Sequence, residues 1–421
     1  MTIFWFRRDL RLEDNHGLMQ ALKNGKTQCV FIFDKSILSQ LNKNDARLSF
    51  IHETLTRLNL ELQQYGSSIK TYFGDPLEVW KDICEDFDVK SVYTNNDYEP
   101  YAIKRDIDVK DLLNTIGVDF KTFKDQVVFE ENEVLKDDGK PYTVFTPYKR
   151  KWLSRFEGVS QFDTLSYSSG FSKSDYQILS LDVLGFEESS QKVKHFTYNE
   201  IDNYDLNRDF PAKDKTSYLS PHLRFGTVSV RSCVINALTL NETFLSELIW
   251  REFFMQILFH FPRVTNACFK TKYEGIQWRN NEVEFEAWCK GKTGYPMVDA
   301  GMRQLNETGY MHNRVRMVVA SFLIKHLLID WRWGETYFAQ KLLDYDLSAN
   351  NGNWQWAAGT GCDSAPYFRI FNPTSQLERF DKDLVYIRHW VKDFDELSYP
   401  QPIVDHKFAR ERCLVAYKKV V

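Results

Sequence analysis

Short apolar runs alternate with amphipathic stretches over the first 125 residues. The runs are rich in β-branched and aromatic residues and cover residues 2–6, 29–33, 69–73, 91–94 and 119–123. The stretches between them have helical spacing, as in residues 47–65, which stop at Gly66, a residue suited to end a helix. This alternation predicts an α/β domain with a doubly wound parallel sheet of five strands.

The pattern changes after residue 125. Residues 126–190 contain Gly139-Lys140-Pro141, Thr146-Pro147 and a Ser-rich run at 166–174. Gly, Pro and Ser disfavour long regular elements, so this region is predicted to be an interdomain connector. Residues 191–421 are almost entirely helical in pattern, with long runs at 246–261 and 313–329 that carry apolar residues three and four positions apart. The sequence therefore predicts an α/β domain (1–125), a connector (126–190) and a larger all-α domain (191–421).

Composition narrows the class of protein. The 421 residues are 43% hydrophobic and 27% charged, as in soluble globular proteins of more than one domain. Seven cysteines form no C-x-x-C pair, no apolar stretch reaches about 18 residues, and residues 1–7 do not begin a signal peptide. We expect a cytoplasmic protein with no membrane segment. A net charge of −4 neither indicates nor excludes binding to nucleic acid.

Residues 344–356 hold two acids, three asparagines and two tryptophans. A segment that is both polar and rich in indole is expected to line a buried, flat site for an aromatic cofactor or a nucleobase. The alternative is a helix end with stacked core tryptophans. Eight of the eleven tryptophans follow residue 245, which favours a site in the second half of the chain.

Two predicted helices carry further candidates. Glu247, Trp250 and Arg251 share one face, where the indole could stack on a planar heterocycle while the acid and guanidinium bind its polar groups. The alternative, to which we give equal weight, is that Glu247 and Arg251 form a surface ion pair beside a partly buried Trp250 and bind no ligand. Arg316 and Met317 share a face in the second helix, although Met is more often plain core.

Other motifs are weaker or absent. Residues 216–221 offer three aliphatic hydroxyls and a phenol before a helix and predict an anion site suited to a pyrophosphate, with a simple Ser N-cap as the alternative. The first strand is followed by Arg7-Arg8-Asp9 instead of G-x-G-x-x-G, and Glu286 stands where a Walker A motif needs glycine. The nine histidines show no metal spacing, so no metal site is expected.

Taken together, these motifs resemble the photolyase/cryptochrome family, and within it the bacterial class I cyclobutane pyrimidine dimer photolyases. The resemblance covers nearly the whole chain. It is carried by residues 4–12, Tyr204 with 208–211, and residues 216–221, 247–253, 292–296, 311–317, 344–356 and 366–373.

The resemblance implies FAD in the all-α domain, with Arg316 paired to Asp344 and Asn350 facing the flavin N5. The residues that it assigns to FAD are Tyr204, Thr216, Ser217, Tyr218, Leu219, Ser220, Arg251, Arg316, Asp344, Tyr345, Asp346 and Asn350.

The resemblance also implies a substrate, DNA with a flipped-out cyclobutane pyrimidine dimer, sandwiched between Trp250 and Trp356. The residues assigned to this DNA are Arg208, Glu247, Trp250, Asn313, Arg314, Met317, Trp356, Arg369 and Gln376. The implied reaction is light-driven electron transfer from reduced FAD to the dimer, with Glu247 and Asn350 among its catalytic residues. Trp354, Trp331 and Trp278 match the tryptophan chain that re-reduces the flavin.

Several alternatives stay open. A cryptochrome-type photoreceptor without repair is the rival, and the set Glu247, Trp250, Met317, Trp356 and Asn350 counts against it. Repair of the (6-4) lesion would require a histidine pair near the dimer. A folate, a deazaflavin or a second flavin could serve as antenna in the first domain, or that site could be empty. We expect the protein to act as a monomer.

Overall fold

The computed structural model describes residues 1–420, which form two compact units. The first comprises residues 1–134, 152–197 and 218–239, and the second comprises 135–151, 198–217 and the chain from residue 240 onward. Both units are therefore discontinuous in sequence. The predicted connector, 126–190, is divided between them, and so is the beginning of the predicted all-α region.

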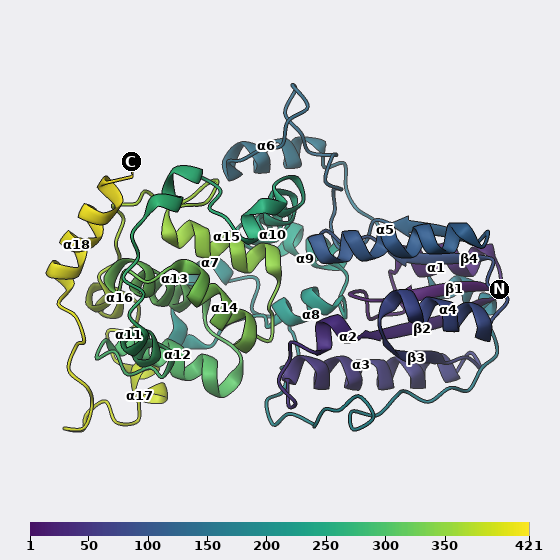
Figure 1. Cartoon of the computed structure of the whole chain (residues 1–421), viewed down its shortest axis with the longest axis horizontal. Helices are drawn as coiled ribbons and strands as arrows, with labels where there is room; N and C mark the ends of the chain where they lie inside the picture. Colours follow the sequence, from purple (N-terminus) through teal and green to yellow (C-terminus); the bar gives the residue numbers. More distant parts are fainter. Residues whose placement is uncertain (421) are drawn as a thin grey trace. The chain divides into compact units, whose positions relative to one another are not determined.

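The first unit is built on a parallel sheet with the strand order β3-β2-β1-β4-β5 (Figure 1). The strands are β1 Thr2–Phe6, β2 Thr27–Asp34, β3 Ile69–Gly74, β4 Ser91–Asn95 and β5 Asp119–Phe123. This confirms the predicted five-stranded parallel sheet. In β1, Phe4 and Phe6 enter one hydrophobic core while Ile3 and Trp5 enter the other, because successive side chains of a strand point to opposite faces.

Helices accompany the sheet in this unit, and most of them add side chains to its two cores. They are α1 His16–Asn24, α2 Lys35–Leu38, α3 Ala46–Gln63, α4 Pro76–Asp86, α5 Pro100–Thr115, α8 Leu219–Phe225 and α9 Val230–Leu240. The core on the Phe4 side includes Leu55 and Leu62 of α3, and the core on the Ile3 side includes Trp80 of α4. Burial on both faces is what a doubly wound sheet requires.

The second unit is helical, as predicted. Its helices are α7 Tyr204–Asn207, α10 Glu242–His260, α11 Glu282–Cys289, α12 Pro296–Thr308, α13 Asn313–Ser321, α14 Trp331–Lys341, α15 Leu347–Ala358, α16 Pro373–Phe380, α17 Val385–Trp390 and α18 His406–Lys418. Helix α6 (Phe145–Arg155) begins within this unit and lies in the predicted connector, where no long regular element was expected. None of the helices in the described part of the chain has both the length and the apolar composition needed to cross a membrane.

The prediction of one continuous helix over residues 313–329 is wrong. Helix α13 ends at Ser321, and a π-helical turn, η5 (Phe322–His326), follows it. Leu328 then has a positive φ of 53° and Asp330 caps α14. The apolar pattern continues through all of these residues because every side chain of the turn is buried, and periodicity reports burial without distinguishing a helix from a wider turn.

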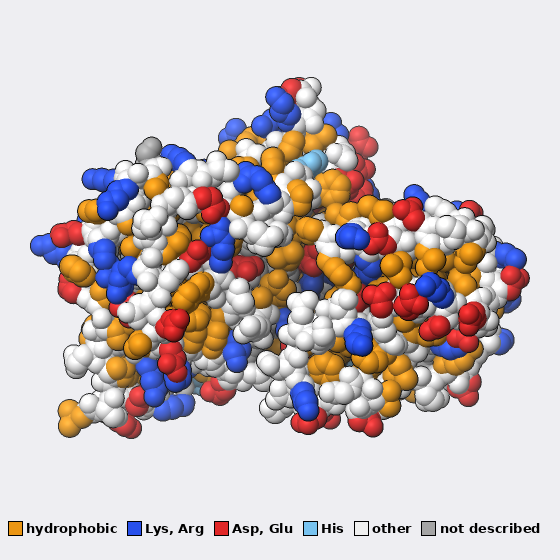
Figure 2. Space-filling model, in the orientation of Figure 1, with side chains coloured by type: hydrophobic (Ala, Val, Ile, Leu, Met, Phe, Trp, Pro, Cys, Tyr) orange, Lys and Arg blue, Asp and Glu red, His pale blue; other side chains and the backbone are white. Residues whose placement is uncertain are grey.

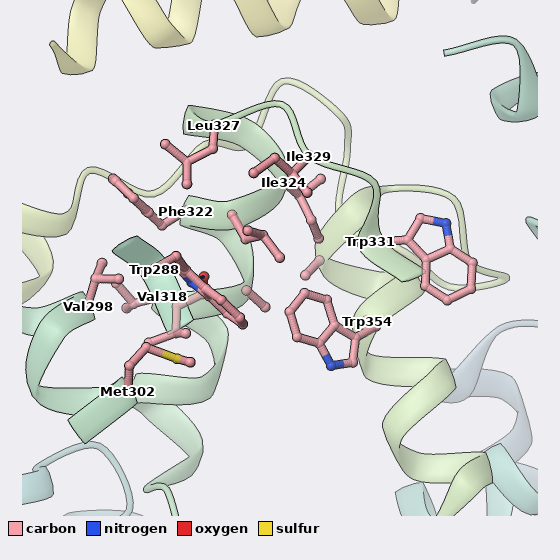
Figure 3. Close-up of a cluster of buried hydrophobic side chains, with 14 of the residues drawn as sticks. Trp288, Val298, Met302, Val318, Phe322, Ile324, Leu327, Ile329, Trp331 and Trp354 are labelled. Carbon is pink, nitrogen blue, oxygen red and sulfur yellow. Dashed lines mark hydrogen bonds between the residues drawn. The ribbon is translucent and has the colours of Figure 1, made fainter. Parts of the chain in front are cut away.

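Close helix packing shapes the core around α13, α14 and α15 (Figure 3). A Cβ at Gly352 of α15 would collide with the ring of Phe254 in α10, and a Cβ at Gly334 of α14 would collide with the ring of Trp354. Glycine at these two positions allows α15 to approach both neighbours. The position of α15 in turn sets the geometry of residues 344–356, the polar and indole-rich segment.

Candidate functional site

The segment 344–356 forms the loop before α15 and most of α15 itself. Asp346 caps the helix by accepting a hydrogen bond from the Ala349 N–H at 3.1 Å. The amides of Asn351 and Gln355 donate to the Val264 carbonyl at 3.0 and 3.1 Å. These two polar residues therefore fix α15 against the 3-10 turn Pro262–Thr265 that follows α10, so part of the polarity of the segment is structural.

Asp344 presents the clearest ligand-binding group of the segment. Its Oδ2 accepts from Arg316 Nη2 at 2.9 Å, and Arg316 Nε donates to the Met311 carbonyl at 2.8 Å. The other carboxylate oxygen, Oδ1, is buried and has no hydrogen-bond partner among the described residues. A buried carboxylate oxygen without a donor is energetically unfavourable, so this atom fits a ligand that brings an N–H or O–H group.

Asn350 is held by an acid that the sequence did not indicate. Its Nδ2 donates to both the carbonyl and the Oε1 of Glu335, each at 3.1 Å. Burial raises the pKa of Glu335, while this hydrogen bond lowers it. Glu335 lies on α14, four residues after Trp331 and so on the same helix face. The four-residue spacing from Trp331 was the one sequence signal that could have indicated Glu335 as a site residue.

The face of α10 that carries Glu247 and Trp250 is arranged by residues distant in sequence. Glu247 Oε1 accepts from Arg208 Nη1 at 2.7 Å, and the Arg208 guanidinium lies 5.1 Å from the ring centroid of Tyr204. The indole of Trp250 is stacked on the ring of Phe145, with centroids 3.7 Å apart and planes 9° apart. Arg208 and Phe145 thus determine how the acid and the indole are presented.

The first turn of α13 gathers a second cationic group. Arg314 Nε donates to Asp209 at 3.2 Å, its guanidinium lies 4.6 Å from the ring centroid of Phe380, and its Nη1 lies 3.7 Å from Met317 Sδ. His312 caps the helix through Nδ1. Burial, followed by the nearby Arg316 charge, lowers the pKa of His312 to about 4, so this cap is neutral at physiological pH.

The tryptophans assigned to electron transfer lie at different depths. Trp354 and Trp331 are buried, whereas Trp278 is half-buried and lies 6.1 Å from Tyr417, centroid to centroid. Figure 3 shows Trp354 between Trp331 and Trp288, and the Trp288 and Trp354 centroids are 6.2 Å apart. Trp288 is therefore a further indole in contact with Trp354, and no sequence motif indicated it.

The residues expected around a pyrophosphate fall in both compact units, namely Thr216 and Ser217 in the second and Tyr218, Leu219 and Ser220 in the first. Tyr218 has a positive φ of 53° just before α8, and its hydroxyl accepts from Lys194 Nζ at 2.7 Å. A non-glycine residue in this conformation stores strain, which is often found at functional sites.

The remaining predicted residues differ in exposure. The half-buried ones are Arg251, Tyr345, Trp356 and Gln376, and the exposed ones are Asn313 and Arg369. On the face drawn in Figure 2, Lys and Arg side chains of the helical unit are interspersed with acidic ones. On this face, binding to a polyanion would therefore depend on individual basic side chains more than on a continuous basic surface.

The first unit has its own polar cluster at the carboxyl ends of the strands. Glu99 accepts from Arg8 at 2.9 Å and from Arg224, and the Tyr98 hydroxyl donates to Glu130 at 2.8 Å. Burial raises the pKa of Glu130 to about 7. This edge of a doubly wound sheet is where ligands commonly bind.

Comparison with known proteins gives matches along the whole chain. Residues 2–166 match a family model described as DNA photolyase, and residues 244–398 match the FAD-binding domain of DNA photolyase. A curated deoxyribodipyrimidine photo-lyase from Halobacterium salinarum is 36% identical, with 100% of this chain and 99% of the relative covered.

Two solved structures are similar over the full length. A bacterial class III photolyase from Agrobacterium tumefaciens has a TM-score of 0.89 at 34% identity, covering 100% of this chain and 97% of that one. An archaeal photolyase from Sulfolobus tokodaii, described as containing two FAD molecules, has a TM-score of 0.88 at 36% identity and full coverage of both chains. The helical unit of this chain therefore contains an FAD-binding domain of the photolyase type.

Proposed function

Because the chain belongs to the photolyase/cryptochrome family, we propose that it is a light-dependent DNA-repair enzyme, a deoxyribodipyrimidine photo-lyase that splits cyclobutane pyrimidine dimers. Full-length similarity to curated photo-lyases supports the repair activity. Reduced FAD, when bound and excited by light, would supply the electron that opens the cyclobutane ring.

The observation that best supports an FAD site is the buried Asp344 oxygen beside Arg316. Asp344 Oδ1 would accept from a flavin N–H group, while Arg316 holds the other oxygen and compensates the carboxylate charge. Asn350, fixed by Glu335, would present its amide to the flavin edge. Tyr204, Arg251, Tyr345, Asp346 and residues 216–220 would complete the cofactor set.

On the substrate side, Trp250 and Trp356 would contact the two sides of a flipped-out dimer. Both indoles are half-buried, as a stacking surface for a base requires. Glu247 would accept from a base N–H, and Met317 and Asn313 would line the site. Arg208, Arg314, Arg369 and Gln376 would bind phosphates. In the free protein, Arg208 and Arg314 pair with Glu247 and Asp209, so these ion pairs would rearrange when DNA binds.

The proposal also covers the antenna chromophore, the photolyase class, the oligomeric state and the location in the cell. An antenna chromophore would bind in the first unit. A flavin is one candidate, because the Sulfolobus relative is described as holding two FAD molecules. The class I assignment stays a prediction, since a class III photolyase is among the similar structures. We also propose that the protein acts as a monomer in the cytoplasm.

The test is a repair assay on purified protein reduced chemically. The protein is mixed with an oligothymidine that carries a cyclobutane dimer, and recovery of thymine absorbance is followed in blue light and in the dark. Light-dependent recovery is expected. Trp250→Ala should weaken binding of the dimer by about 1–3 kcal/mol, the scale of one lost base stack.

Flavin that is present and photoreducible without any repair would contradict the photo-lyase proposal and favour a photoreceptor. Absence of flavin binding would contradict the role given to Asp344 and Arg316. A Trp250→Ala variant with unchanged affinity for the dimer would remove that residue from the substrate site.

A further inference from the structure

One face of Trp250 is covered by a residue from the predicted connector. The Phe145 ring is parallel to the indole at 3.7 Å, and the Phe145 side chain is itself buried, with 8% of its surface exposed. Phe145 also makes an edge contact with Phe253, whose ring centroid is 5.9 Å away. An indole has two stacking faces, and Phe145 occupies one of them in a parallel stack; the rings of Phe254 and Phe253 also contact the indole, at 5.4 Å with a tilt of 30° and at 5.5 Å edge-on.

The backbone of Phe145 is tied to the loop that follows α15. Its N–H donates to Asp363 Oδ2 at 2.9 Å, and Asp363 lies a few residues beyond Trp356, which is in the last turn of α15. The segment that covers Trp250 is therefore bonded to the loop that leaves the helix carrying the second predicted indole.

Two further bonds fix the same segment along α10. The Tyr148 hydroxyl lies 3.3 Å from Glu252 Oε1, and Lys149 Nζ donates to Ser246 Oγ at 2.7 Å. Tyr148 is fully buried. Contacts to α10 before and after Trp250 therefore anchor the start of α6, the helix that carries Phe145.

We propose that Phe145 is a positioning residue for the lesion: it supports one face of Trp250, so that a flipped-out base stacks on the opposite face only. This inference rests on the proposed photo-lyase function. An indole held in one plane before binding loses less conformational freedom when a base stacks on it, and such pre-organisation increases affinity. The hydrogen bond from the Phe145 N–H to Asp363 holds Phe145 at a fixed position relative to the loop that follows α15.

The test uses variants that separate the aromatic ring from the bulk of the side chain. Phe145→Leu retains an apolar side chain of similar size without a flat ring, Phe145→Tyr retains the ring, and Asp363→Ala removes the backbone anchor. Dissociation constants are measured for a dimer-containing oligonucleotide and for the same undamaged oligonucleotide, together with flavin content and the repair rate at saturating DNA.

Phe145→Leu and Asp363→Ala should weaken dimer binding roughly threefold to tenfold, the range of one aromatic pair. Binding of undamaged DNA, flavin content and the saturated repair rate should stay at the wild-type value, and Phe145→Tyr should bind the dimer like the wild type. A support that acted only in folding would instead reduce flavin content and every kind of binding.

Three results would overturn the inference. The first is wild-type dimer affinity in Phe145→Leu, and the second is an equal loss for damaged and undamaged DNA. The third is a Phe145→Tyr variant as weak as Phe145→Leu. If the wild-type protein itself does not prefer the dimer, the proposed photo-lyase function fails together with the inference. If all three variants keep the preference of the wild type for the dimer, the inference fails but the proposed photo-lyase function stands.

Discussion

Replacing Asp344 by asparagine tests the assignment of the flavin site most directly. The change keeps the shape of the side chain, removes its charge and turns one acceptor into a donor. In the protein, the Asp344 side chain is 7% exposed and its partner Arg316 is 27% exposed. Loss of one partner from a fully buried pair costs about 3–5 kcal/mol. Because Arg316 is partly solvated and keeps its bond to Met311, we expect the free energy of unfolding of the flavin-free protein to fall by about 1–2 kcal/mol.

The effect on flavin binding should be larger than the effect on folding. If Oδ1 accepts from the flavin, the asparagine variant loses a hydrogen bond to a charged acceptor, worth about 1.5–3 kcal/mol. That loss corresponds to a flavin affinity roughly 10- to 150-fold weaker. Asp383→Asn is a matched control, because it makes the same charge change at an exposed position.

Urea unfolding followed by circular dichroism gives the stability of each flavin-free variant, and a flavin fluorescence titration gives its affinity. The reasoning is refuted if Asp344→Asn binds flavin as tightly as Asp383→Asn does. Reduced stability with unchanged flavin affinity would mean that the Arg316 pair is structural and that Oδ1 does not meet the cofactor.

Three other predictions follow from particular contacts. Trp278→Phe should slow photoreduction of oxidised flavin, measured by absorbance, and leave repair by chemically reduced protein intact; an equal loss of both would make Trp278 structural. His312→Asn should flatten the pH dependence of unfolding: the folded-state pKa of about 4 lies below the unfolded value, so the wild type loses about 2–3 kcal/mol as pH falls from 6.5 to 4. An equal pH dependence in the asparagine variant, which can still cap the helix, would contradict this. Gly334→Ala should destabilise the protein by about 1–3 kcal/mol, because its Cβ would collide with Trp354 and Leu323; an unchanged urea midpoint would contradict the packing.

Local sequence was sufficient for most of the first unit. Strand β1 alternates Ile3 and Trp5 with Phe4 and Phe6, and the two sets enter different cores, which is the signature of a sheet buried on both faces. Helix α10 was predicted four residues short at its start, since its cap, Asn241, precedes the apolar pattern. Helix ends are set by single capping bonds, which periodicity does not detect.

In the candidate site, residue types were predictable but most partnerships were not. The pattern of 344–356 indicated a polar, indole-rich site, and the resemblance implied the contact between Arg316 and Asp344 that the structure has. The support of Asn350 by Glu335 was not foreseen. Glu335 carries no motif of its own, and its role depends on the packing of α14 against α15.

The sequence by itself determined the five strands, the helical class of the second unit, the two buried faces of the sheet and the chemical character of the candidate site, because these follow from the spacing of side chains along one strand or helix. The tertiary structure alone decided the π-helical turn after α13, the pairing of Arg208 with Glu247 and the stacking of Phe145 on Trp250. The two pairings join residues far apart in the chain. Which of several suitable arginines or aromatic rings reaches a given partner depends on how whole helices pack, and that packing is fixed by close contacts such as those at Gly334 and Gly352.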